Sequence, residues 1–389
     1  MKLPAFGPKL LAGVFLILSV SLTFAQTENT ATIDCSGVTP GAFTSIATAI
    51  LSSPDHTAFT ISGNCTENLV LLQRRNDLSF FASAPTTIQS ATPTQQVMDI
   101  NGSQNISFLG PITMSGGQGV SIINSSGIFF SGVTVQNSGN FGIDSNNSQV
   151  QFAGGSISAN TRTGIVTFGG TLELDGVTVS NNGRLGISAA TTHLIVFDGG
   201  DLPTVMSHNG AAGIQLVNLS EGDFDGNHQI TNNAGGAFGL LVSGNSTMVM
   251  QGGVINGNSG IGVVCQATTA CEFGGTQING NTGGGIQIMT HSELDLDSSV
   301  VVSGNTGVGV LIDQASTMGT NGGNTITNNT GDALIVNALS VLNLVAPDTI
   351  TATAGNLALN CNNGSMVTGD IGTFKPKKCG AQFQANPIH

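Results

Sequence analysis

The middle of the chain contains two arginines whose spacing could support chemistry. Arg162 and Arg184 are the only Arg or Lys between residues 100 and 370, and each lies two residues before a glycine in a similar segment. We expect them to stack on one outer edge, with Asn140 one segment earlier and Asp144 nearby. Arg162, Arg184 and Asp144 are therefore candidate catalytic residues, or a site for a small anionic ligand. The alternative interpretation is a pair of solvated turn residues on an acidic surface.

Three aspartates form a candidate metal site. Asp175, Asp198 and Asp225 occupy similar places in three consecutive segments, each close before a glycine. If the segments stack, the three carboxylates lie only about 5 Å apart, and Ca²⁺ accepts six to eight oxygen ligands in flexible geometry. The sequence thus predicts a possible Ca²⁺ site. The alternative is that Asp-Gly is simply favourable turn chemistry, which needs no metal.

The overall composition restricts the class of partner. Only 8% of the residues are charged, the formal net charge is −13, and hydrophobic residues make up 39%. An acidic chain argues against nucleic acid and anionic membrane as partners, and the hydrophobic content predicts a packed fold. The chain has no Trp and no Tyr, so a glycan would have to be bound by Asn, Ser, Thr and acidic groups rather than by these aromatic rings.

The N-terminal segment predicts export. Residues 1–25 contain two lysines, an apolar run over 10–20 and small residues at a cleavage position, as a signal peptide does. The apolar run is shorter than a membrane span requires. We therefore expect a cleaved, secreted or cell-surface or periplasmic protein without a membrane span in the mature chain.

Six cysteines follow the signal peptide, and an even number in an exported chain favours disulfides. Fifteen connectivities are possible. The cysteines fall into three couples that are close in sequence, so we expect Cys35 with Cys65, Cys265 with Cys271, and Cys361 with Cys379. A metal site is disfavoured because no C-x-x-C pair or nearby Cys/His quartet is present.

A repeat extends through most of the chain, as in VTVSNNGRLGI and VSGNTGVGV. A glycine before an aliphatic residue recurs at intervals of 22 to 27 residues: Gly119, Gly142, Gly164, Gly186, Gly213, Gly239, Gly262, Gly285 and Gly309, with Ala333 in the tenth copy. An asparagine precedes it by a few residues in nine copies: Asn137, Asn160, Asn182, Asn209, Asn233, Asn258, Asn281, Asn305 and Asn329. Stacked asparagines can form a ladder of amide hydrogen bonds.

The aliphatic residues within each copy alternate with polar ones, which is the period of a strand with one buried face. A repeat of this length holds three short strands and three turns. We therefore predict an all-β fold, a right-handed parallel β-helix of about 10–12 coils. We expect an N-terminal cap and first coils over 26–105, including a short helix near 44–52, regular coils over 106–345 and a C-terminal cap over 346–389.

The segment FTSIATAILSSPDHTAFTISGNCTENLVL, followed by the Asn-rich coils, resembles right-handed parallel β-helix proteins of the pectin lyase-like superfamily. That superfamily includes polysaccharide lyases, glycoside hydrolases, esterases, epimerases, tailspikes and adhesins, so the resemblance implies the fold and leaves the activity open.

The catalytic patterns that this resemblance would imply are missing from the sequence. There is no Asp-Asp pair and no Gly-His-Gly, and we expect Glu173, Glu272 and Asp295 to lie on well-separated coils. We therefore favour a non-catalytic surface or adhesion-type protein that contacts a polysaccharide or cell-surface glycan. The alternative is a polysaccharide lyase or glycoside hydrolase with a non-standard site.

Overall fold

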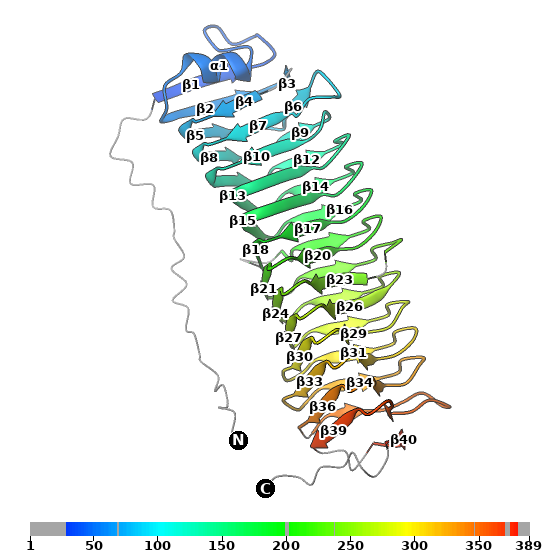
Figure 1. The fold of residues 1–389 in the computed structure, drawn as a ribbon. Helices are drawn as coiled ribbons and strands as arrows, with labels where there is room; N and C mark the ends of the chain where they lie inside the picture. The colour runs from blue at the N-terminus through cyan, green and yellow to red at the C-terminus, as the bar shows by residue number, and fades with distance from the viewer. Residues whose placement is uncertain are drawn as a thin grey trace.

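The computed structural model describes residues 29–67, 70–198, 202–236, 238–345, 347–369 and 374–379. The expected signal peptide lies outside these residues. Within them, strands stack in parallel into one elongated coil, with the N-terminal turns at one end and the C-terminal turns at the other (Figure 1). None of the helices in the described ranges is long and apolar enough to cross a membrane.

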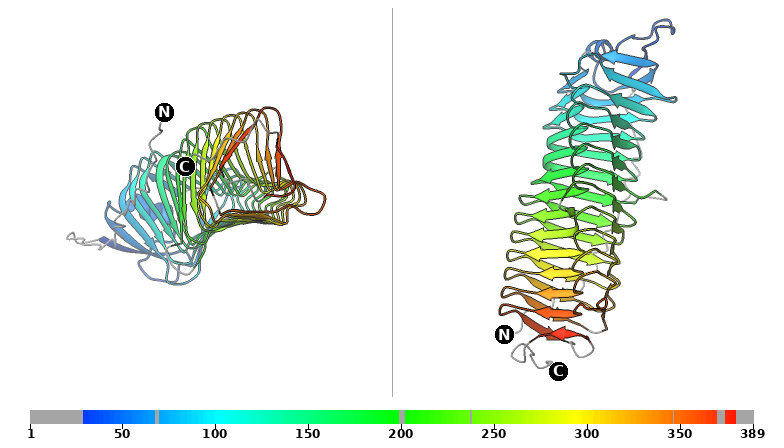
Figure 2. Two further views of the ribbon diagram at one scale, coloured as in Figure 1. Left: turned by 90° about the horizontal axis from the view of Figure 1, so that it is seen from below. Right: turned by 90° about the vertical axis from the view of Figure 1, so that its right-hand side faces the viewer.

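Each turn of the coil contributes one strand to each of three faces, which Figure 2 shows end-on and from the side. Face 1 contains β4 (Val70–Gln73), β7 (Met98–Asn101), β10 (Val120–Ile123), β13 (Ile143–Ala153), β15 (Ile165–Asp175), β17 (Ile187–Ala190), β20 (Ile214–Val217), β23 (Phe238–Ser243), β26 (Ile261–Gln266), β29 (Ile286–Met289), β32 (Val310–Ile312), β35 (Leu334–Val336), β38 (Leu359–Cys361) and β40 (Lys377–Lys378).

Face 2 begins with β1 (Asn29–Asp34) and continues, after each corner, with β2 (Thr57–Ser62), β5 (Asn76–Phe81), β8 (Gln104–Leu109), β11 (Ser126–Ser131), the second halves of β13 and β15, β18 (His193–Phe197), β21 (Glu221–Asp225), β24 (Thr247–Gln251), β27 (Ala270–Gly274), β30 (Glu293–Leu296), β33 (Thr317–Thr320), β36 (Val341–Leu344) and β39 (Met366–Gly369). Because β13 and β15 pass through the corner without a break, faces 1 and 2 form one 27-stranded sheet.

Face 3 is a separate 13-stranded sheet of β3 (Asn64–Glu67), β6 (Thr86–Ser90), β9 (Ile112–Ser115), β12 (Thr134–Gln136), β14 (Ser156–Ser158), β16 (Thr178–Ser180), β19 (Val205–Ser207), β22 (Gln229–Thr231), β25 (Val254–Asn256), β28 (Gln277–Asn279), β31 (Val301–Ser303), β34 (Thr325–Thr327) and β37 (Thr349–Ile350). One strand per turn gives about thirteen turns. The predicted all-β solenoid is confirmed, with slightly more coils than expected.

The alternation of the sequence produces the core, because every second residue of each strand points inside. On face 2 the inward position of five consecutive coils is phenylalanine: Phe59, Phe80, Phe108, Phe130 and Phe152, with ring centroids 4.5 to 5.3 Å apart. Offset aromatic stacks at this separation add to the free energy gained from burial. Phe197, by contrast, lies in register with Asp175 and Asp225 on the outer side.

The N-terminal end of the core is covered by α1 (Ile46–Ser52), which the sequence predicted. Ser45 caps it by accepting a hydrogen bond from the Thr48 N–H, and Ile46, Ala49 and Ile50 are its buried residues. The carboxylate of Glu67 accepts a hydrogen bond from the Ile46 N–H at 2.6 Å. This charge satisfies an N–H of the first helical turn that has no partner within the helix.

The six cysteines form three disulfides with the predicted pairing, Cys35–Cys65, Cys265–Cys271 and Cys361–Cys379. The central bridge joins β26 to β27 across the corner of one coil, and the other two lie toward the two ends of the solenoid. Strands β37 to β39 continue the parallel stacking beyond residue 345.

Candidate functional site

The asparagine ladder lies inside the corner between faces 3 and 1. Eight of the predicted residues are buried: Asn160, Asn182, Asn209, Asn233, Asn258, Asn281, Asn305 and Asn329. Each donates from Nδ2 to the Oδ1 of the next at 2.9 to 3.0 Å, up to Asn329. Asn329, at the end of the ladder, donates to the Val302 carbonyl. The ladder satisfies buried polar groups from coil to coil and has a structural role.

Asn137 does not belong to this ladder. It is exposed and has a φ of 56°, and Ser138 takes the inward position, where its N–H donates to Asn160 Oδ1 at 3.0 Å. The physical reason is the spacing, since Ser138 and not Asn137 lies four residues before the repeat glycine Gly142. The prediction for Asn137 is therefore wrong.

A second ladder, which the sequence analysis missed, lines the corner between faces 1 and 2. Its hydroxyl residues accept hydrogen bonds at 3.1 to 3.2 Å from the N–H of the preceding coil, as Ser246 does from Ser220, Ser292 from Thr269 and Ser316 from Ser292. The signal was present, because a Ser or Thr recurs there at almost every repeat. Both ladders stabilise the scaffold that presents the outer side chains.

The two candidate arginines stack as expected on one exposed edge. The Arg162 N–H donates to the Asn140 carbonyl at 3.0 Å, and the Arg184 N–H donates to the Arg162 carbonyl at 3.1 Å. The Arg162 guanidinium lies 5.4 Å from the centre of the Phe141 ring. Asp144 points outward from face 1, and burial raises the pKa of its carboxyl. Among the described residues no ion pair joins Asp144 to either arginine, so the catalytic role of this group stays a prediction.

The predicted column of three aspartates does not form. Asp175 and Asp225 are in register, but Phe197 occupies the position between them, and Asp198 lies one residue further along. Asp198 instead accepts a hydrogen bond from the Asn227 N–H at 2.9 Å. The two coils repeat at an offset of 22 residues, whereas Asp198 lies 23 residues after Asp175, so the column prediction is wrong. In the described part of the chain no group of three His, Cys, Asp or Glu residues is arranged to hold a metal ion.

Carboxylates do converge elsewhere on face 2. Glu272 of β27 and Asp295 of β30 are direct partners in adjacent coils, which corrects the expectation that they are well separated. Asp297 follows β30 and lies close enough to hydrogen-bond Glu272. Their separation in sequence, one repeat length, could have revealed this pairing.

The environment raises the proton affinity of these groups. Burial raises the pKa of the Glu272 carboxyl, and the charge of Asp297, a hydrogen bond to it and the charge of Asp295 raise it further. Burial also raises the pKa of Asp295, reinforced by the charges of Glu293 and Asp297. A cluster of carboxyl groups with raised pKa values is a candidate functional site.

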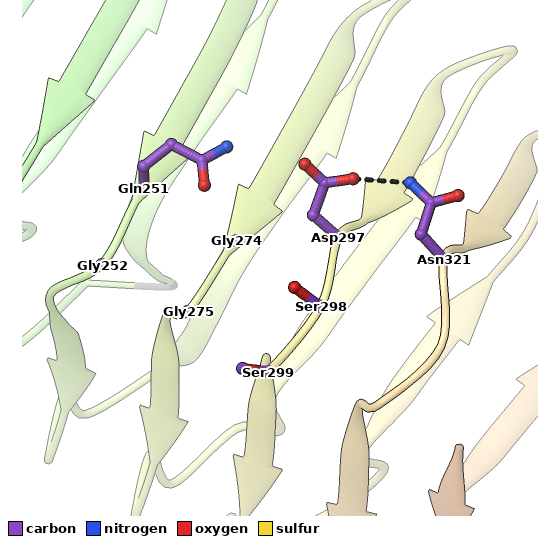
Figure 3. A pocket seen from close by; sticks show the side chains of 8 residues that line it. All are labelled: Gln251, Gly252, Gly274, Gly275, Asp297, Ser298, Ser299 and Asn321. Atoms are coloured by element: carbon purple, nitrogen blue, oxygen red, sulfur yellow. Dashed lines mark hydrogen bonds between the residues drawn. The ribbon is translucent and has the colours of Figure 1, made fainter. Parts of the chain in front are cut away.

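Beside this cluster lies an open groove of about 570 Å³, lined by Gln251, Gly252, Gly274, Gly275, Asp297, Ser298, Ser299 and Asn321. In Figure 3, Gln251 and Asp297 stand on either side of Gly274 and Gly275, and Asn321 donates a hydrogen bond to Asp297. Gln251 leans over Gly274, since a Cβ on that glycine would lie 2.0 Å from Gln251 Oε1. The missing side chain therefore leaves room for Gln251, whose Nε2 donates to Glu272 at 3.4 Å.

His228 is another ionisable group in an unusual environment, and it lies near Asp198 and Asp225. It is fully buried, it packs edge-on against Phe224, and neither ring nitrogen has a hydrogen-bond partner. Burial lowers the pKa of His228 to about 4, although the charges of Asp198 and Asp225 oppose this shift. The imidazole is therefore neutral at pH 7 and is held away from solvent.

Solved structures share this architecture at low sequence identity. The Azotobacter vinelandii mannuronan C-5 epimerase AlgE4 A-module is 13% identical, with a TM-score of 0.53, over 83% of this chain and 93% of the other. A mutant of the periplasmic alginate epimerase AlgG is 14% identical, with a TM-score of 0.50, over 76% of each chain. The receptor-binding tailspike protein of bacteriophage Det7 is 10% identical, with a TM-score of 0.45, over 92% of this chain and 76% of the other. The likenesses to the two epimerases show the fold alone.

No curated protein matches the sequence. The family described as "Right handed beta helix region" matches residues 97–199 and 168–331, which together exceed half of the chain. The parallel three-faced coil with its internal asparagine ladder agrees with that match. The chain therefore belongs to the right-handed β-helix family.

Proposed function

We propose that the protein is an exported glycan-binding protein that holds a neutral polysaccharide in the groove along the corner between faces 2 and 3. The observation that carries this proposal is the groove itself, where amide, hydroxyl and carboxylate side chains converge beside three glycines. Ligand sites are typically concave, with a few polar groups that fix orientation. Gln251, Asp297 and Asn321 supply the donors and acceptors that sugar hydroxyl groups require.

The charge of the groove favours a neutral polymer over a polyuronate. Asp297 lines the groove and Glu272 and Asp295 adjoin it, whereas Arg162 and Arg184, the basic residues between positions 100 and 370, belong to coils several turns away. A polyanion would bring further carboxylates to this surface without a cation to pair with them. Mannuronan and alginate, after which the two similar epimerases are named, are polyanions of this kind.

The direction of the groove suits an extended chain. Its lining residues come from four successive coils, from Gln251 to Asn321, which are about 4.8 Å apart. A polymer lying along the solenoid axis would therefore meet a new set of hydrogen-bonding groups at each coil, and weak contacts would add along its length.

A second candidate function is glycoside hydrolysis at the same place. It is favoured by the raised pKa values of Glu272 and Asp295 on adjacent coils. The coil spacing of about 4.8 Å is close to the carboxyl separation of about 5 Å in retaining enzymes. In this mechanism protonated Glu272 would donate a proton to the glycosidic oxygen, and Asp295 would act as the nucleophile.

The test is a binding and cleavage panel of neutral polysaccharides and polyuronates with the purified protein. We expect retention on a neutral polysaccharide, loss of that retention in Asp297→Asn, and unchanged retention in the matched control Asp223→Asn, which lies on face 2 outside the groove. Binding without new reducing ends supports the first function. New reducing ends that disappear in Glu272→Gln support the second, and retention on polyuronates alone contradicts both.

A further inference from the structure

The outer side of face 3 is chemically uniform over the whole length of the solenoid. Most of its strands place outward side chains on both sides of a buried apolar one, as Thr325 and Thr327 lie around Ile326 and Val254 and Asn256 around Ile255. Every outward residue in these thirteen strands is Thr, Ser, Val, Gln or Asn. The result is a surface of small and uncharged groups.

Charge is segregated away from this surface. Glu67, the carboxylate found in a face 3 strand, is buried and bonded to the Ile46 N–H. On face 2 of the same coils, by contrast, Asp223, Glu272 and Asp295 point outward. A ligand surface that complements face 3 therefore carries no net charge, because an ionised partner would find no counter-charge there.

The outward groups of face 3 are ordered before any ligand arrives. Hydrogen bonds join them from coil to coil: Ser156 Oγ to Thr134 Oγ1 at 3.2 Å, Ser303 Oγ to Asn279 Oδ1 at 3.0 Å, and Thr327 Oγ1 with Thr351 Oγ1 at 2.7 Å. The β-branched Thr and Val residues are also restricted at χ1. Little side-chain entropy remains to be lost when a ligand binds.

These groups repeat in two dimensions. Neighbouring strands are about 4.8 Å apart, and outward residues within a strand are about 6.7 Å apart, twice the rise per residue. Water oxygens on the prism face of hexagonal ice repeat at two comparable distances. Uncharged hydroxyl and methyl groups at this spacing can hold water in a lattice-like order, whereas an ion would impose its own hydration shell.

Other occupants fit the surface less well. No aromatic residue points outward from the face 3 strands, so a sugar ring has nothing to stack on. The large exposed apolar side chains of the described residues also lie elsewhere, for example Phe81 and Phe168, and protein interfaces are anchored by such residues. We propose that the outer side of face 3 is an ice-binding surface, distinct from the groove along the corner between faces 2 and 3.

The test measures thermal hysteresis, inhibition of ice recrystallisation and uptake of the protein into a growing ice crystal. We expect all three for the purified protein, and a several-fold loss in Val254→Lys, which places a charge in the middle of face 3. Val249→Lys is the matched control, because it makes the same change on face 2 of the same coil. It should retain the activity of the unmodified protein.

Two further variants keep the test decisive. Asn256→Lys charges a fully exposed position of the same strand and should reduce activity even if Val254→Lys unfolds the coil, whereas Val254→Thr should preserve it. The inference is overturned if the protein shows no ice activity, or if Val249→Lys and Val254→Lys lose it equally. It is also overturned if charging face 3 abolishes binding to an insoluble polysaccharide and leaves ice unaffected.

Discussion

Faces 2 and 3 are built from the same coils and differ almost entirely in what they present to solvent. On face 2, Glu272 stands directly opposite Asp295 in the next coil, and Asp223 points outward from the same face. On face 3, the corresponding neighbours are pairs such as Ser156 and Thr134, which hydrogen-bond to each other. Directly opposed like charges destabilise a sheet, whereas paired hydroxyls stabilise it.

This contrast separates what specifies the fold from what is left for function. Most inward residues of both faces are apolar and have little freedom to vary in polarity. The outward carboxylates of face 2 repel one another, which lowers the stability of the fold. Face 3 has the same kind of backbone and no such repulsion. The fold therefore does not require these acidic outer residues.

The largest predicted effect comes from breaking the interior that supports both faces. Asn233 accepts from the Asn209 side chain and backbone and donates to Asn258 and to the Met206 carbonyl. Asn233→Ala leaves several buried polar groups without partners, at about 1–3 kcal/mol each. We expect a loss of about 4 kcal/mol in the free energy of unfolding, measured by denaturant titration.

Asn256→Ala is the control for this prediction, because Asn256 is also an asparagine in the same coil but is exposed on face 3. It should change the free energy of unfolding by no more than about 0.5 kcal/mol. Equal effects of the two substitutions would show that the ladder is not the support that its geometry indicates.

How far the sequence predicted these features depends on whether they repeat. The core and the asparagine ladder recur in nearly every coil, so period and alternation were sufficient to predict them. Asp198 shows the limit: aligning the Asp-Gly pairs places it one residue out of register, because Phe197 is the true partner of Asp175. The groove combines side chains of four coils around Gly274, and its position depends on a register that the sequence leaves open.

The next largest effect is the pH dependence of stability that the buried side chain of His228 causes. The pKa of His228 is about 4 in the folded protein and about 6.5 when unfolded, so the unfolded chain binds more protons between these values. The contribution of His228 to the free energy of unfolding is therefore fully present above pH 6.5, where the imidazole is neutral in both states. It is lost as the pH falls toward 4. We expect a loss of about 3 kcal/mol over this window, measured by denaturant titration at several pH values.

His228→Thr is the informative variant, because Thr204 and Thr276 occupy the related buried position before a face 3 strand. The variant should lose most of the pH dependence between 6.5 and 4 and remain folded at pH 5. A pH dependence identical to that of the unmodified protein would exclude His228 as its source.

Outer carboxylates should respond in the opposite direction. The folded pKa of Glu272 is raised, so its contribution to stability is present at low pH and is lost as the pH rises through that pKa. Glu272→Gln removes the repulsion from Asp297 and Asp295, so we expect a higher melting temperature at pH 7 and little change at pH 4. Glu221→Gln, at an exposed position of face 2, should alter neither value appreciably. A lower melting temperature of Glu272→Gln at pH 7 would contradict this account.

The smallest change in stability, with a specific effect on the groove, is expected for Gly274→Ala. The backbone at Gly274 does not have the positive φ that would exclude alanine, but the new methyl group would meet the Gln251 amide, the mobile end of a long side chain. Gln251 can move aside at a cost below about 1 kcal/mol, and in doing so gives up its contact with Glu272. We therefore expect an almost unchanged melting temperature together with weaker retention on neutral polysaccharide. Ice recrystallisation should be inhibited as in the unmodified protein, because face 3 of the same coil is untouched; a parallel loss of both activities would mean that the two faces do not act independently.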